Sequence, residues 1–442
     1  MKKYAFLAIA GFSGAVCAQS NVSISGRADV GIEVGNSGYG SKTRVQSGQS
    51  TGNRLTFKGD EKLGNDLSAF FILEAGYLLD NGQASSNGSL QQGGTPTAAG
   101  AGVNSGTNVA STGAGSYLFQ RVSVLGLKSS FGTVQIGRMD SPAYPIMCSS
   151  DASACGTAAR TSTVFGMLAG SADRFDSSVS YQTPNMNGFD AQIAYSTGAE
   201  NNQTVTAYTS FDSTLAGNAK LVGTGKGEKD GKAWGLNLRY ANGPMSLGWA
   251  YHNARLALGS ADITAIRTNA ETVFTGNGQA AANGFVNGVR ENTAKMWILG
   301  GTYDFGMAKL FATYGAGKLE TTGWSANATD GARLSDRRGW TLGASMPFGA
   351  HSVRLNLGKN DDRLTADQDY SYWGVHYEYV MSKRTAVYGA YAMINNANRA
   401  GNLGAARPIQ SASSTSMSVN NVAGANGNFD PSALQIGVRH SF

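Results

Sequence analysis

The sequence predicts an all-β fold: a 16-stranded antiparallel transmembrane β-barrel with short periplasmic turns, long external loops and an inward-folded third loop. Three observations support this prediction. Apolar residues alternate with polar ones along many segments, and short connections alternate with long ones. After the N-terminus, no stretch approaches the roughly 18 consecutive apolar residues of a membrane-spanning helix. The composition agrees, because 60 glycines, 18 tyrosines and 18 phenylalanines accompany only 14% charged residues.

The N-terminus has the pattern of a secretory signal. Two lysines precede a short apolar run, and a site of small residues ends at Ala18. We therefore expect residues 1–18 to be a signal peptide and residues 19–442 to form the barrel. A lipoprotein signal that uses Cys17 is the alternative, but the large Val16 directly before that cysteine disfavours it.

The segment 22–34 shows the alternation most clearly. Its even positions are apolar and its odd positions are mostly polar or charged, Arg27 among them. Because a pleated strand sends successive side chains to opposite faces, one face is apolar and the other is charged. The pattern recurs, often with Tyr or Trp near the segment ends, as an interfacial aromatic girdle requires. Further examples are 54–58, 71–77, 174–181, 234–240, 353–357 and 373–379.

The connections between these segments fall into two classes. Seven are short and rich in Gly, Pro, Asn, Asp or Ser, which favour turns: 60–66, 129–133, 183–188, 241–244, 304–307, 347–350 and 381–384. Eight are longer and polar: 35–52, 78–116, 139–172, 197–231, 252–294, 315–337, 359–370 and 395–432. Fifteen connections join sixteen strands, and an even number lets the first strand pair with the last. A soluble β-sandwich is disfavoured, because loops of this length are uncommon there.

The sequence gives little support to catalysis or metal binding. Of four histidines, His252 and His351 resemble strand ends and His440 lies near the C-terminus, so His376 is the one candidate base. No serine motif of the nucleophile-elbow type accompanies it. The glycine-rich stretch 223–227 fails the spacing of a phosphate-binding loop. We therefore expect no enzymatic activity, no cofactor and no metal, and we expect no nucleic acid as a partner.

Five stretches, in this order and at this spacing, carry a resemblance to a known family: Asn53–Gly59, Phe131–Arg138, Arg174–Phe189, Ser382–Thr385 and Gly437–Phe442. The chain resembles the trimeric general porins of Gram-negative bacteria, in particular their β-proteobacterial and neisserial branch. The resemblance covers essentially all of 19–442. It implies an outer-membrane homotrimer in contact with lipid and lipopolysaccharide, a third loop folded into the lumen, and a terminal Phe442 recognised by the barrel-assembly machinery.

The predicted constriction combines the third loop, 139–172, with basic residues on the barrel wall. The resemblance matches Arg54, Arg121 and Arg174 to positions of an arginine cluster at the narrowest point of the pore. Strand parity adds Arg27 and Lys58, whereas the parity of Arg138 is ambiguous. Each could also be an ordinary solvated side chain of a wide lumen.

The third loop supplies two acidic candidates for the constriction, Asp140 and Asp151, although either could lie in a solvated turn. It also contains Cys148 and Cys155, which the family does not lead us to expect. Export to an oxidising compartment favours a disulfide between them, and two unpaired thiols are the alternative. Such a bridge would stiffen the first half of the loop.

These features predict a passive diffusion channel for small hydrophilic solutes and ions across the outer membrane. Two loop carboxylates face four or five cations, so we expect a preference for anions. The alternative is a substrate-specific outer-membrane channel for anionic nutrients, which would share the barrel but line its neck for one class of ligand.

Overall fold

The structure is a computed structural model. It describes residues 21–36, 40–84, 118–165, 168, 173–198, 210–211, 221–222, 232–256, 291–322, 332–363, 369–396 and 430–442. The predicted signal peptide, 1–18, lies outside these residues, as do most positions of the longest predicted loops. Among the described residues, no helix is long and apolar enough to cross a bilayer.

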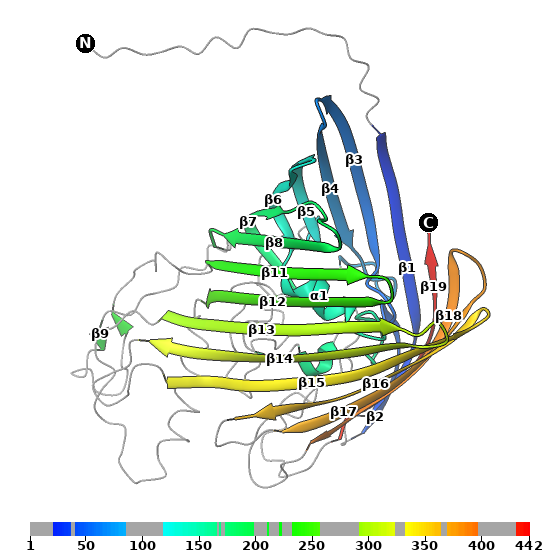
Figure 1. The fold of residues 1–442 in the computed structure, drawn as a ribbon. Helices are drawn as coiled ribbons and strands as arrows, with labels where there is room; N and C mark the ends of the chain where they lie inside the picture. Colours follow the sequence, from blue (N-terminus) through cyan, green and yellow to red (C-terminus); the bar gives the residue numbers. More distant parts are fainter. Residues whose placement is uncertain are drawn as a thin grey trace, which may run out of the picture.

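One antiparallel sheet of seventeen strands dominates the fold (Figure 1). Two further strands, β9 and β10, form a separate pair. The strands, in chain order, are β1 (Asn21–Asn36), β2 (Ser41–Ser47), β3 (Arg54–Gly64), β4 (Leu67–Gly76), β5 (Val122–Ser129), β6 (Gly132–Asp140), β7 (Arg174–Gln182), β8 (Phe189–Ser196), β9 (Ser210–Phe211), β10 (Leu221–Val222), β11 (Ala233–Asn242), β12 (Met245–Leu256), β13 (Glu291–Asp304), β14 (Lys309–Thr322), β15 (Ala332–Phe348), β16 (His351–Asp362), β17 (Tyr370–Val380), β18 (Thr385–Asn396) and β19 (Ser432–Ser441).

The sheet closes between its first and last strands. β1 pairs with β19 along one edge, from Arg27 opposite Ser441 to Asn36 opposite Ser432. Its other edge pairs with β2 over one half and with β3 over the other. β2 and β3 therefore share one strand position, interrupted at residues 48–53, and the barrel has the sixteen positions that the sequence predicts. Closure leaves no open edge in hydrocarbon.

The prediction of a first long loop over 35–52 is wrong for much of that range, because strand occupies part of it. Only four residues separate β1 from β2, and β2 continues the ladder. Its sequence, SKTRVQS, has one large apolar residue, Val45, so it gives no alternating hydrophobic signal. Several other strands also extend into stretches predicted as loops, β12, β14, β15 and β16 among them. The backbone ladder evidently continues beyond the apolar band, where hydrophobicity no longer marks it.

The seven predicted short turns are confirmed, since each coincides with a short connection between consecutive strands. The turn between β3 and β4 consists of Asn65 and Asp66, whose φ angles are 49° and 63°. Asn and Asp tolerate this left-handed conformation, which matches the twist of a two-residue hairpin. Short turns thus gather at one end of the barrel and long connections at the other.

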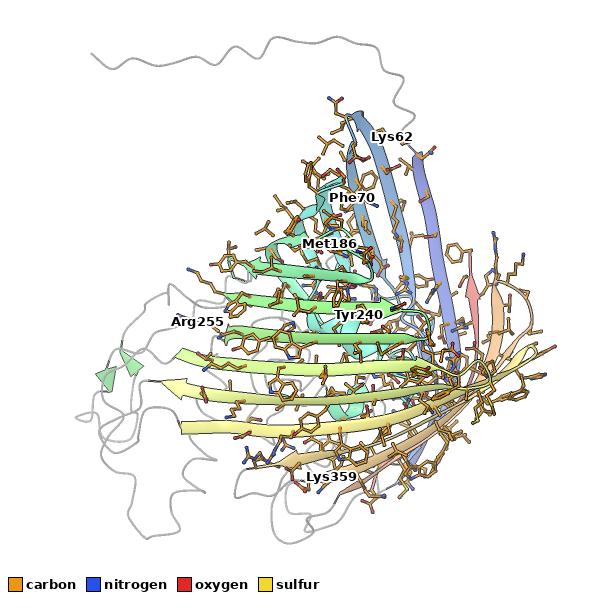
Figure 2. All side chains as sticks on the ribbon, in the orientation of Figure 1. Lys62, Phe70, Met186, Tyr240, Arg255 and Lys359 are labelled. Carbon is orange, nitrogen blue, oxygen red and sulfur yellow. A yellow bond between two sulfur atoms is a disulfide. The ribbon has the colours of Figure 1, made fainter. Side chains whose placement is uncertain are left out.

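The outer surface is apolar, as contact with lipid requires. Its exposed side chains include Ile24, Ile136, Ile193, Leu355 and Ile436, each on the outward face of its strand. Side chains project from the outside of the sheet all along its length (Figure 2).

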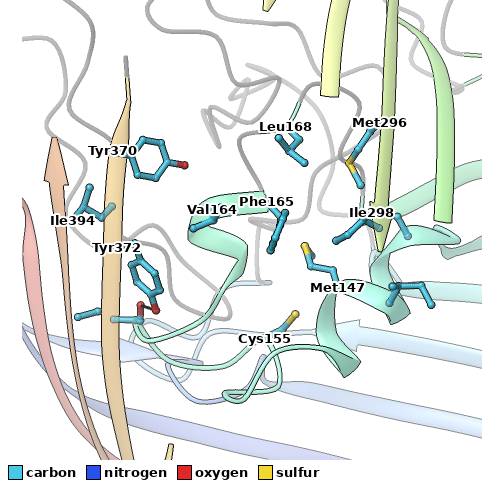
Figure 3. Close-up of a cluster of buried hydrophobic side chains, with 14 of the residues drawn as sticks. Met147, Cys155, Val164, Phe165, Leu168, Met296, Ile298, Tyr370, Tyr372 and Ile394 are labelled. Atoms are coloured by element: carbon cyan, nitrogen blue, oxygen red, sulfur yellow. Dashed lines mark hydrogen bonds between the residues drawn. The ribbon is translucent and has the colours of Figure 1, made fainter. Parts of the chain in front are cut away.

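The third loop turns into the barrel, as predicted. It contains two short helices, α1 (Ala143–Ser149) and α2 (Ser162–Phe165). α1 lies against β11, β12 and β13, while α2 lies against β15 and β16 (Figure 1). Apolar residues of the loop pack on apolar residues of the inner wall (Figure 3). This cluster includes Met147, Val164, Phe165 and Leu168 from the loop and Met296, Ile298, Tyr370, Tyr372 and Ile394 from the wall.

Candidate functional site

The start of the third loop is tied to the wall by two side chains. The backbone amide of Ala143 donates to Nε2 of His252 at 2.9 Å, and Nδ2 of Asn237 donates to the carbonyl of Pro142 at 2.9 Å. His252 lies within β12 and is buried, so its predicted place at a strand end is wrong. These bonds satisfy backbone groups that would otherwise be buried without partners.

The middle of the loop is held mainly by Asn356 of β16. Its Nδ2 lies 3.0 Å from Oδ1 of Asp151, 3.0 Å from Oγ of Ser153 and 2.8 Å from the carbonyl of Ala159. One wall side chain thus joins three points of the loop that are separated in sequence. Farther along, the Tyr370 hydroxyl donates to the Thr163 carbonyl at 2.9 Å.

The tip of the loop reaches the interruption between β2 and β3. The Thr157 amide donates to the carbonyl of Gln49 at 2.6 Å. The neighbouring Gly156 lies so close to the Ser50 carbonyl that a Cβ would collide with it. Beside this contact, the Ala158 amide donates to Oε1 of Gln435 at 2.8 Å. The interruption is therefore the point where the loop tip meets the wall.

Asp29 of β1 shapes the interruption itself. Its Oδ2 accepts the amide of Thr51 at 2.7 Å, and its own amide donates to Oδ1 of Asn53 at 2.6 Å. The hydroxyl of Tyr388, on β18, donates to Oδ1 of Asp29 at 2.5 Å. The strand break and the loop contact are thus set by residues from three separate strands.

Cys148 and Cys155 are joined by a disulfide that connects the end of α1 to the loop tip. Asp151 lies between them and is 2% exposed. Its carboxylate accepts the amides of Ser153, Cys155 and Thr161 at 2.8, 3.0 and 3.0 Å. Burial raises the pKa of Asp151, and these amides partly oppose the rise. The structure thus differs from the expectation that Asp151 lines the constriction, because the carboxylate is enclosed within the loop.

Four of the predicted basic residues gather on β1, β3, β7 and the residue before β5. Arg27 and Arg54 are direct partners in the ladder between β1 and β3. Nε of Arg174 donates to the backbone carbonyl of Arg121 at 2.9 Å. Arg27, in addition, donates to the hydroxyl of Thr51 at 3.3 Å. We call Arg27, Arg54, Arg121 and Arg174 the arginine cluster.

Two carboxylates accompany the arginine cluster. Glu74 of β4 lies 2.6 Å from Nε of Arg121 and 3.8 Å from Nε of Arg54. Asp140, at the end of β6, lies 2.9 Å from Nε of Arg174 and is partly exposed. Glu74 was not among the predicted site residues, because nothing local in the sequence shows that it faces two arginines.

The third loop meets the arginine cluster at Tyr144 of α1. The guanidinium of Arg174 lies over the Tyr144 ring, 4.6 Å from its centroid. Such a contact is favourable because the ring face carries partial negative charge. The loop and the basic wall therefore contact each other here.

Two partly buried charges flank this contact at the end of the loop. Burial raises the pKa of Asp173, and the neighbouring Arg174 and Arg160 oppose that rise. Burial likewise lowers the pKa of Arg160, which Asp173 opposes. Asp173 was not among the predicted site residues, since the loop was expected to end just before it.

Arg439 and Arg354 extend the basic wall and were missed. Both contact Oε1 of Glu378, at 3.0 Å and 3.4 Å. Arg439 lies on β19, directly opposite Asp29 of β1. Arg439 belongs to the C-terminal stretch Gly437–Phe442, which predicts closure of the barrel but does not show that this side chain faces the lumen.

Two predicted residues do not join the cluster. Arg138 is paired across the ladder with Ser123, which shares the outward face of β5 with exposed Leu125. Its guanidinium bonds to Asp176. Lys58 is exposed and lies four residues from Arg54, toward the short-turn end of β3. Among the residues that the structure describes, no group of His, Cys, Asp and Glu could hold a metal ion.

Comparisons with known proteins identify the family. A family model for the Gram-negative porins matches residues 5–399. An outer membrane porin protein of Bordetella pertussis is 26% identical over 427 residues, covering 87% of this chain and 92% of its own. Outer membrane porin protein 32 of Delftia acidovorans is 26% identical over 450 residues, covering 99% of this chain and 98% of its own.

Solved structures share the fold. An anion-selective porin from Comamonas acidovorans has a TM-score of 0.65 at 22% identity, covering 96% of this chain and 100% of its own. OmpT of Vibrio cholerae has a TM-score of 0.57 at 12% identity, covering 98% of this chain and 100% of its own. With the family model matching most of the sequence and a closed barrel in the structure, the chain belongs to the Gram-negative porin family and is a channel protein of the outer membrane.

Proposed function

We propose that this porin is a passive diffusion channel for small hydrophilic solutes and ions, and that its arginine-lined constriction gives it a preference for anions. One observation carries the proposal. Arg27, Arg54, Arg121 and Arg174 gather on one part of the wall, while the only carboxylate of the described loop segment 141–165, Asp151, is enclosed within the loop. The loop therefore offers no exposed negative charge there to oppose the arginines.

The charge balance of the cluster supports anion preference. Four guanidinium groups face two carboxylates, Glu74 and Asp140, which leaves an excess of two positive charges. Arginine stays protonated at any physiological pH and is more weakly hydrated than lysine. In a narrow neck with low-dielectric walls, such an excess raises the local concentration of anions, and dissolved salt screens it.

The fixed position of the loop supports diffusion without gating. The bonds of His252 and Asn237, the contacts of Asn356 and the contact between Thr157 and Gln49 hold the loop at its start, middle and tip, and the disulfide links α1 to the tip. A constriction of fixed width selects by size and charge alone, which is how a general porin discriminates.

Recording from planar bilayers under a salt gradient tests this proposal. The zero-current potential measures ion preference. We expect it to shift toward the value of a less anion-selective pore in Arg54→Gln, Arg121→Gln and Arg174→Gln. Lys58→Gln and Arg138→Gln remove the same charge outside the cluster and should leave the potential near its wild-type value. If the three cluster variants and the two controls give the same potential, the cluster does not set selectivity.

A substrate-specific channel for anionic nutrients is the second candidate. The cross-strand pairing of Arg27 with Arg54 favours it, because two arginines on one face suit the several oxygens of a phosphate or carboxylate. The two functions differ in conductance. A general porin conducts in proportion to salt concentration, whereas a specific channel is blocked saturably by its substrate.

We further propose the remaining features of a porin for this chain: removal of residues 1–18 as a signal peptide, a homotrimer, lipid and lipopolysaccharide as surroundings, and insertion by the barrel-assembly machinery. The geometry of Phe442 supports the last of these. Its backbone exchanges hydrogen bonds with Gly26 at 2.9 and 3.1 Å, while its side chain remains 49% exposed at the closing seam. A terminal aromatic in this position is open to recognition before the seam forms.

A further inference from the structure

A small group of apolar side chains lies on the inner wall of the barrel, next to the arginine cluster. It consists of two residues of β4, Phe70 and Ile72, and two residues of β5, Val122 and Val124. Ile72 is directly opposite Val124 in the ladder between these strands, so the four positions are contiguous. We call these four residues the inner apolar patch.

The ladder shows that the patch faces the lumen. Val122 is directly opposite Glu74, whose carboxylate contacts the arginine cluster, and residues two positions apart along a strand share a face. Leu125, between two inward positions of β5, is 66% exposed on the outer face. Phe70 also points inward, because its ring occupies the space that a Cβ of Gly126 would need, and Gly126 lies two residues after Val124.

The inner faces on both sides of the patch are polar. Lys58 and Asp60 of β3 are the ladder partners of Ile72 and Phe70, and β6 places Gln135 beside β5. The two helices of the third loop lie against β11–β13 and β15–β16, on other parts of the wall. Phe70 and Ile72 are only partly buried, although the interior of a porin is normally polar. Apolar side chains beside a few charged groups are typical of a site for a small molecule.

The charges around the patch favour one orientation of a bound molecule. The two charged ladder partners on β3 have opposite signs and balance each other. At the other end of the patch, Arg54 and Arg121 share the carboxylate of Glu74, at 3.8 and 2.6 Å, which leaves positive charge in excess. Glu74 is two residues from Ile72, and two residues of strand span about 6.6 Å. A short acyl chain has a similar length, so one small molecule can reach both the arginines and the patch.

We propose that the inner apolar patch and the adjoining arginines form a binding site for small amphipathic carboxylates. The carboxylate contacts Arg54 and Arg121, and the hydrocarbon part lies on Ile72 and Phe70. Arginine forms strong, charge-assisted hydrogen bonds with a carboxylate, and apolar contact adds affinity in proportion to the area removed from water. This proposal rests on the proposed preference for anions, because the arginine cluster draws the carboxylate into the channel, and it specifies which anions the channel binds.

Block of the chloride current by hexanoate tests the proposal in planar bilayers that contain the full-length porin. Acetate is the second probe, since it carries the same charge without the longer chain. In wild type, hexanoate should reduce the current saturably, and acetate should need a concentration about tenfold higher or more. Ile72→Thr and Phe70→Thr should each raise the half-blocking concentration of hexanoate about fivefold and leave that of acetate unchanged. Threonine keeps the strand preference of these positions.

Phe311→Thr is the matched control, because it removes an aromatic ring from the inner face of β14, away from the cluster. Phe311 is two residues from Thr313, whose hydroxyl donates to the loop carbonyl of Ser150. This variant should be blocked like wild type, whereas Arg54→Gln should weaken the block by both anions.

The zero-current potential in chloride distinguishes the two proposals. It should be unchanged in Ile72→Thr and Phe70→Thr, since the arginines remain, whereas failure of the proposed ion preference would leave it unchanged in Arg54→Gln as well. The binding site is overturned if hexanoate and acetate block wild type at equal concentrations, or if hexanoate blocks the two patch variants and Phe311→Thr alike.

Discussion

Asp151 illustrates what single residues contribute to the constriction. Asp151 lies in the loop segment that the disulfide closes. Its carboxylate accepts hydrogen bonds from three backbone amides and from the side chain of Asn356. The sequence identifies it as one of few charges in the loop but cannot tell a lining carboxylate from an enclosed one. That distinction depends on Asn356, which lies 205 positions away along the chain.

The raised pKa of Asp151 leads to a pH-dependent prediction. A carboxyl whose pKa is higher in the folded state than in the unfolded one contributes stability below its ordinary pKa, and this contribution is lost as pH rises through the folded value. Relative to Asp151→Asn, wild type should therefore lose thermal stability as pH rises above the ordinary carboxyl range. Melting of both proteins in detergent across this range gives the difference, and a constant difference would contradict the prediction.

Asn356 offers a second test at the residue scale. Asn356→Ala removes a donor that lies near three loop acceptors, and each net hydrogen bond is worth about 1 kcal/mol. We expect a loss of about 2 kcal/mol in stability together with noisier single-channel current, because the loop loses its middle attachment. Asn395→Ala, on the exposed outer end of β18, is the control. Equal noise in the two variants would show that the loop does not depend on Asn356.

Among the elements, the third loop depends on attachments at three places. Its helices are too short to be stable alone, so their positions come from packing on the wall and from side chains such as His252 and Gln435. The disulfide adds a link within the loop, between α1 and the tip. The loop is therefore held against the inner wall by these contacts and not by its own helices.

The disulfide should limit fluctuation rather than determine selectivity. In the double variant Cys148→Ser, Cys155→Ser, the wall contacts of Asn356 and Gln435 remain, so the loop should stay folded inward. We expect a larger variance of open-channel current and an unchanged zero-current potential. Reduction of the wild-type protein should produce the same change, and the double variant should not respond to reductant. A shifted potential would mean that the bridge also positions the arginines.

The strands were predictable wherever one face meets lipid. Alternation and turn residues located the seven short turns, because both signals are local. β2 was missed since its residues are polar on both faces, although its backbone completes the ladder beside β1. The interruption at 48–53 could not be predicted from the sequence either, because the hydrogen bond between Asp29 and Tyr388 that shapes it spans 359 positions. The family resemblance supplied Arg54, Arg121 and Arg174 and strand parity supplied Arg27, whereas Glu74, which lies beside two of these arginines, was not predicted.

For the whole molecule, function requires that the first and last strands close the barrel. The seam joins β1 to β19, and it ends at Gly26 and Phe442 with two reciprocal backbone hydrogen bonds. The ring of Phe442 covers Gly26 so closely that a Cβ there would collide with it. An antiparallel ladder of ten residue pairs provides the rest of the seam. Closure therefore combines the hydrogen bonds of this ladder with the close packing of Phe442 on Gly26.

Gly26→Val should therefore impair closure. Its side chain must displace the Phe442 ring or part the strands at the end of the seam, and a β-branched residue cannot avoid the contact by rotation. We expect slower folding into detergent micelles and a lower yield of heat-modifiable barrel on gels. Gly389→Val, in neighbouring β18, is the control, since the atom nearest to a Cβ there lies 3.7 Å away. If both variants fold at the same rate, the terminal contact does not limit closure, and the tube is sealed by the ladder alone.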